Sequence, residues 1–79
     1  MKVTIHTRRV LADPSLLVYQ VELEHDGMWR ETFGSITELA NFLRGVEASY
    51  NLVTGGFLRL PDIPTQPNET VSKTTDAPS

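Results

Sequence analysis

Apolar residues recur every three or four positions between Ser35 and Tyr50, which is the period of an amphipathic helix. The apolar positions of this stretch are Ile36, Leu39, Ala40, Leu43, Val46 and Tyr50, with Phe42 at the margin of the same arc. Ser35 followed by Glu38 is a capping-box pattern, in which two side chains satisfy free backbone N–H groups reciprocally. The spacing predicts a helix from Ser35 to about Tyr50, packed on a sheet. Gly45 is the alternative end of this helix, because an Arg-Gly pair is also typical of a helix C-terminus.

Polar and apolar residues alternate in two stretches before this helix, 1–9 and 16–24, and alternation is the period of a half-buried strand. The residues expected on the inner face are Val3, Ile5 and Thr7 in the first strand and Leu17, Tyr19, Val21 and Leu23 in the second. Asp13-Pro14-Ser15 predicts a turn between the two strands, because proline presets φ.

A third strand is predicted over 28–33, after a hairpin loop. The length of this loop decides on which face of the sheet each side chain of the third strand lies. A two-residue loop at 26–27 would place Trp29 and Phe33 on the face of the acidic residues of the second strand. A three-residue loop at 25–27 places both on the apolar face. We therefore predict the longer loop, a type I turn followed by glycine in the left-handed conformation. The expected cross-strand pairs are Leu23–Trp29, Tyr19–Phe33 and the opposite charges Glu22–Arg30.

The end of the chain changes in composition. Residues 57–60 (Phe-Leu-Arg-Leu) alternate and predict a short fourth strand. Four of the five prolines lie from Pro61 onward, among Thr, Ser, Asp and Asn, so this segment buries too little apolar surface to offset its ordering entropy. We expect a single small domain over 1–61 and a disordered tail over 62–79.

These elements predict an α+β fold in the order β-β-β-α-β. The sheet would have four strands, mostly antiparallel, with the helix packed on one face. A right-handed crossover through the helix would place the last strand parallel to the first, which gives the sheet order 3-2-1-4.

Composition narrows the function classes. The chain has 79 residues, no cysteine and a formal net charge of -3. The missing cysteines exclude disulfides and thiolate metal sites and favour a reducing compartment. No apolar run resembles a signal peptide or approaches the roughly 20 residues that span a bilayer. We therefore expect a cytoplasmic protein without a membrane partner.

Few side chains suggest chemistry. His6 and His25 are the only histidines, and neither has a second ligand at a metal-binding spacing, so we expect neither a metal nor a cofactor. Glu31 and Glu47 both fall on inward-facing positions, and two such acids could perform acid–base catalysis. More often such acids lie at the edge of a small sheet and pair with arginines. We expect a protein that is not an enzyme, with catalysis by these two acids as a minor alternative.

A nucleic-acid-associated protein is the second alternative. Lys2, Arg8 and Arg9 form a basic stripe on the first strand, as phosphate binding would require. No aromatic residues alternate with them to stack on bases, and Glu22 and Glu24 on the neighbouring strand would offset their charge. Nucleic acid is therefore the less favoured partner.

Exposed apolar residues favour a protein partner. Leu16 and Val18 fall on the outer face of the second strand, where polar residues are expected, and grouped exposed apolar residues can mark a contact site. The candidate partner-binding residues are Leu16, Val18, Arg8, Arg9 and Arg30. The sequence thus predicts a small non-catalytic protein-interaction module. It would be an adaptor, accessory subunit or inhibitor, of the size of many inhibitors encoded by phages or mobile elements. A homodimer would also suit so small a core.

Overall fold

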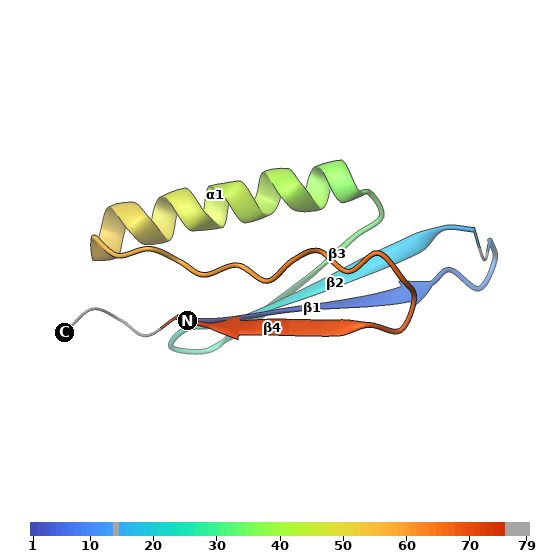
Figure 1. The fold of residues 1–79 in the computed structure, drawn as a ribbon, viewed down its shortest axis with the longest axis horizontal. Helices are drawn as coiled ribbons and strands as arrows, with labels where there is room; N and C mark the ends of the chain where they lie inside the picture. The colour runs from blue at the N-terminus through green and yellow to red at the C-terminus, as the bar shows by residue number, and fades with distance from the viewer. Residues whose placement is uncertain (14, 76–79) are drawn as a thin grey trace.

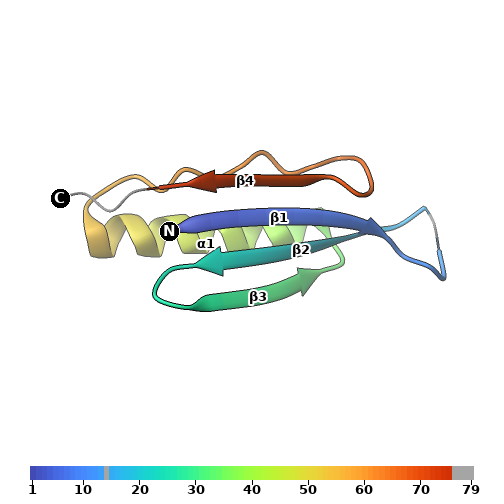
Figure 2. The ribbon, with the colours of Figure 1, turned by 90° about the horizontal axis from the view of Figure 1, so that it is seen from below.

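The computed structural model describes residues 1–13 and 15–75, so Pro14 of the predicted turn and 76–79 of the predicted tail lie outside the described residues. The elements are β1 (Lys2–Arg9), β2 (Leu17–Glu24), β3 (Met28–Phe33), α1 (Ile36–Thr54) and β4 (Thr70–Thr74). The strands form one antiparallel sheet in the order β3-β2-β1-β4, and α1 lies along one face of it (Figures 1 and 2). The α+β class, the element order and the sheet order are as predicted.

The core lies between α1 and the inner face of the sheet. Its buried residues are Val3, Ile5, Tyr19, Val21, Leu39, Leu43, Tyr50 and Leu58. The predicted alternation holds in β1, where Val3, Ile5 and Thr7 have no exposed surface. The register between β2 and β3 is also the predicted one, with the pairs Leu23–Trp29, Tyr19–Phe33 and Glu22–Arg30.

The loop between β2 and β3 has the predicted three residues, 25–27, but not the predicted conformation. Asp26 takes the left-handed conformation at φ 56°, while Gly27 has a φ of 143°. The His25 N–H donates to the Gly27 carbonyl within the loop, at 3.0 Å. Aspartate tolerates the left-handed region better than most residues with a side chain, so the exchange of roles with glycine is sterically accessible.

The helix is longer than predicted and continues through Gly45 to Thr54. Ser35 is the N-cap, and its hydroxyl accepts a hydrogen bond from the Thr37 N–H at 3.2 Å rather than from Glu38. Gly55 ends the helix in the left-handed conformation, at φ 70°, where its N–H donates to the Asn51 carbonyl.

The fourth strand does not form where it was predicted. Residues 57–60 make no strand, whereas Thr70–Thr74 pairs antiparallel with β1. The prediction of disorder is therefore wrong for β4. The predicted parallel orientation is also wrong, because residues 55–69 return along the length of the molecule before β4 begins (Figure 1). The side chains of 57–60 nevertheless alternate between buried and exposed as predicted, since Leu58 is buried and Phe57 is exposed.

Thr7 fixes the turn that leads into β4. Its hydroxyl donates to the Gln66 carbonyl and accepts from the Glu69 N–H at 3.1 Å. Its backbone N–H donates to the Glu69 carbonyl, and its carbonyl accepts from the Asn68 N–H, both at 2.9 Å. A buried threonine on an inner strand thereby satisfies four polar backbone groups of a segment that has little apolar surface of its own.

The other end of β4 is fixed to the first residue of the chain. The Thr75 N–H donates to the Met1 carbonyl at 2.8 Å, and the buried Thr75 hydroxyl accepts from the Arg59 N–H at 2.7 Å. These bonds join β4, β1 and the segment that follows the helix into one folded unit.

Candidate functional site

The outer face of the sheet is covered by no element of the described chain (Figure 2). Its charges are partly paired across strands. Arg30 on β3 makes an ion pair with Glu22 on β2, with Nε and Oε1 3.1 Å apart, and Lys2 lies opposite Glu24. Arg30, one of the five predicted partner-binding residues, therefore belongs to this charge-paired part of the face.

The other four predicted residues lie at the end of the β1–β2 hairpin. Arg8 and Val18 are cross-strand partners, and with Arg9 they line a hollow of about 480 Å³. Leu16 lies where the loop joins β2 and is half-exposed, and Leu11 in the same loop is 100% exposed. We call this group the tip patch, and its members are Arg8, Arg9, Leu11, Leu16 and Val18.

The loop that displays Leu11 is held by hydrogen bonds. The Val10 N–H donates to the Leu16 carbonyl at 3.1 Å, and the Leu16 N–H donates to the Asp13 carbonyl at 3.0 Å. The Asp13 carboxylate accepts from the Ser15 hydroxyl at 2.6 Å and from the Ser15 N–H at 3.1 Å. These two bonds, the side-chain one foremost, lower the pKa of Asp13 below its usual value, so its charge persists to lower pH. The hydrogen-bonded loop therefore exposes the Leu11 side chain to solvent next to Arg8 and Arg9.

The basic residues of the nucleic-acid alternative do not form one patch. Lys2 and Arg8 lie toward opposite ends of β1, roughly 20 Å apart at about 3.3 Å per residue. Glu22 and Glu24 on β2 lie opposite the Lys2 half of β1. Only Arg8 and Arg9 remain together, at the tip patch.

The two acids considered for catalysis are both exposed. Glu31 lies on the inner face of β3 as the register predicted, but at the open edge of the sheet. Glu47 is exposed on α1, so its predicted inward position is wrong. The buried carboxylate pair that acid–base catalysis would use is therefore not formed by these residues.

The two histidines lie on different elements, His6 on β1 and His25 in the loop between β2 and β3. His6 Nδ1 is hydrogen-bonded to the Thr70 hydroxyl across β1 and β4. Within residues 1–13 and 15–75, no three side chains of His, Asp or Glu gather where they could hold a metal ion.

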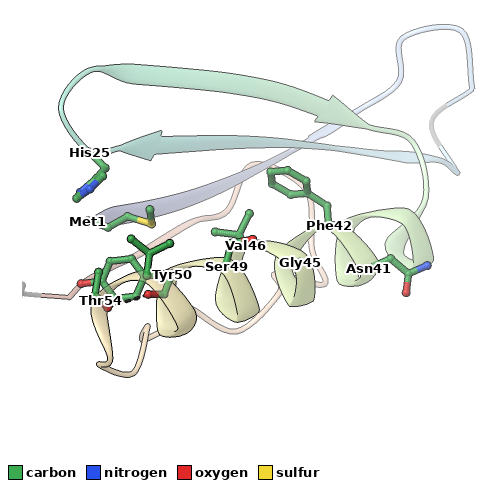
Figure 3. Close-up of a pocket in the computed structure, with 10 residues that line it drawn as sticks. Met1, His25, Asn41, Phe42, Gly45, Val46, Ser49, Tyr50 and Thr54 are labelled. Carbon is green, nitrogen blue, oxygen red and sulfur yellow. Dashed lines mark hydrogen bonds between the residues drawn. The ribbon is translucent and has the colours of Figure 1, made fainter.

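The structure contains a larger groove that the sequence pattern did not reveal. It has a volume of about 540 Å³ and lies between α1 and the β2–β3 hairpin (Figure 3). Its lining includes Phe42, Val46 and Tyr50 from the helix, His25 from the hairpin loop and Met1. One feature of the sequence points to this groove, the position of Phe42 at the margin of the apolar arc of the helix. A small sheet cannot cover so wide an arc, so part of the arc remains open.

Two aromatic contacts border this groove. The His25 and Tyr50 rings stand edge to face, with centroids 6.3 Å apart. Trp29 on β3 stacks on Phe42, with centroids 5.1 Å apart. The groove is therefore continuous with the aromatic side chains along the β3 edge of the sheet.

No protein-family model, curated protein or solved structure matches this chain. Among the helical residues that the structure describes, no segment combines the length and apolar character needed to cross a membrane.

Proposed function

We propose that this chain is a small non-catalytic protein-interaction module, an adaptor, accessory subunit or inhibitor that works in the cytoplasm. The observation that supports the proposal is the tip patch. Leu11 is fully exposed and Leu16 is half-exposed beside the hollow that Arg8 and Arg9 line. Covering apolar surface releases roughly 25 cal/mol per Å², so a partner that covers these leucines gains affinity.

The chemistry of the tip patch indicates an acidic partner segment. In the part of the chain that the structure describes, neither Arg8 nor Arg9 is in an ion pair. A guanidinium binds a carboxylate through two parallel hydrogen bonds, and arginine is enriched at the centres of protein interfaces. The expected partner places one or two carboxylates against the arginines and an apolar side chain in the hollow.

The experiment is capture from nuclease-treated lysate of the native host, followed by affinity measurement with the purified captured protein. We expect Arg8→Glu, and separately Leu11→Ser combined with Leu16→Ser, to weaken binding at least tenfold. Leu52→Ser is the matched control, because Leu52 is also an exposed leucine, at 86%, but lies on α1. Each variant is first compared with the wild type by circular dichroism.

Two outcomes would overturn the proposal. One is a captured protein whose affinity is the same for the tip-patch variants and the wild type. The other is recovery that disappears on nuclease treatment, which would identify nucleic acid as the partner of Arg8 and Arg9.

A further inference from the structure

The second surface of interest is the open edge of β3. This strand is the last in the sheet and pairs on one side only, with β2. Its six residues, Met28–Phe33, contain neither proline nor glycine. An edge of this kind presents a row of backbone N–H and C=O groups to which an extended segment of another chain can bind. The backbone offers the affinity, and the side chains along the edge determine which segment fits.

Aromatic side chains extend the inner face of this edge. Trp29 and Phe33 both lie on the inner face of β3, and both contact Phe42 of α1, with ring centroids 5.1 and 5.0 Å apart. Trp29 remains 43% exposed. An added strand would place alternate side chains on this face, where Trp29 and Phe33 offer apolar contact.

Glu31 lies between these two aromatic residues on the same face. Its side chain is exposed, and within residues 1–13 and 15–75 it makes no ion pair. A carboxylate between two apolar positions favours a partner strand with a basic residue opposite it. The partner strand that fits this face therefore carries an apolar, a basic and a second apolar residue at every second position.

The same charges disfavour a second copy of this chain at this edge. In a symmetric antiparallel pairing that keeps both helices on one face, the registers centred on β3 place Arg30 opposite Arg30 or Glu31 opposite Glu31. Like charges directly opposite each other destabilise a strand pair. The edge charges therefore favour a different protein over self-association.

We propose that β3 accepts an extended segment of another protein as a fifth, antiparallel strand. A lysine or arginine of that segment lies opposite Glu31, and its flanking apolar side chains cover Trp29 and Phe33. This surface shares no residue with the tip patch, so the inference goes beyond the proposed function and does not depend on it. With both surfaces occupied, the chain would join two proteins.

The probe is a pair of capped synthetic peptides, TVTKTVT and TVTETVT, which differ only in the central charge. Titration of the full chain is followed by NMR, with hydrogen exchange at the β3 amides as the second readout. We expect TVTKTVT to shift and protect the β3 amides and to bind about fivefold tighter than TVTETVT, from the energies of cross-strand charge pairs.

A charge reversal makes the test specific. Glu31→Lys should exchange the preference, so that TVTETVT binds tighter, whereas Glu47→Lys on α1 is the matched control and should leave the preference unchanged. Equal affinity of the two peptides, protection outside β3, or no binding at about 1 mM peptide would overturn the proposal. A homodimer that Glu31→Lys dissociates would also overturn it. None of these results depends on Arg8 or Leu11, so the two proposals can fail separately.

Discussion

At the scale of single residues, the buried hydroxyl of Tyr50 affects stability most directly. It is 5% exposed, and among the described residues its hydroxyl has no hydrogen-bond partner. A buried hydroxyl without a partner costs about 1–3 kcal/mol in desolvation. The helical spacing predicts that Tyr50 is buried, but no sequence pattern reveals the missing partner, because that depends on which groups of distant segments surround the ring.

Tyr50→Phe removes this hydroxyl and keeps the ring. We expect the free energy of unfolding to rise by about 1 kcal/mol, because the desolvation cost disappears while the packing stays. The measurement is urea denaturation followed by circular dichroism. Tyr50→Ala is the control and should lower the free energy of unfolding by about 3–5 kcal/mol through the cavity it leaves. A loss of stability in Tyr50→Phe would show that the hydroxyl has a partner after all.

At the scale of elements, the sequence predicts best where two constraints agree. The alternation in β2 and β3 and the length of the loop between them allow one common register, and that register is confirmed. The same alternation groups Arg8 with Val18 at one end of the sheet. The groove between α1 and the hairpin could not be predicted, because it depends on how far the helix axis lies from β3.

The fourth strand shows why a pattern can mislead. Residues 57–60 alternate because they cover the core, but their backbone groups bind side chains: the Leu58 N–H donates to Asn51 Oδ1 and the Arg59 N–H to the Thr75 hydroxyl. β4 is polar because an edge strand needs little apolar surface, and Val71 is its one apolar residue. The β-branched threonines of β4 are the feature of the sequence that could have predicted a strand there.

Two glycines in or beside α1 should respond to alanine with opposite signs. At Gly45 an added Cβ meets no atom within 4 Å, so Gly45→Ala should stabilise the chain by about 1 kcal/mol through helix propensity. At Gly55 the φ of 70° disfavours any Cβ, so Gly55→Ala should destabilise it by about 1–2 kcal/mol. Thermal denaturation of both variants checks the signs. If both variants lose stability, the helix is interrupted at Gly45 in solution.

At the scale of the whole molecule, the chain is long and narrow, with extents of 46, 19 and 18 Å. Met1 and Thr75 are hydrogen-bonded to each other toward one end, and the loop between β1 and β2 forms the opposite end (Figure 1). The bonds of Thr7 hold the turn before β4, and those of Thr75 join the end of β4 to Met1 and Arg59. We expect residues 62–75 to unfold together with β1.

Truncation distinguishes this arrangement from a domain that ends at residue 61. A chain of residues 1–75, which keeps β4, should unfold in one cooperative transition. A chain of residues 1–61 should lack a cooperative transition, because β1 loses one neighbour and the Thr7 hydroxyl loses its partners. Calorimetry of the two truncated chains decides the question. A cooperative transition in 1–61 would show that the first three strands and the helix are sufficient.

The pairing of β1 with β4 also has a consequence for synthesis. β1 leaves the ribosome before β4, with two strands and the helix between them in the chain, yet β1 and β4 are neighbours in the sheet. Until β4 emerges, one side of β1 has no strand beside it. The sheet is therefore completed only after β4 has left the ribosome, and until then the open side of β1 is accessible to chaperones.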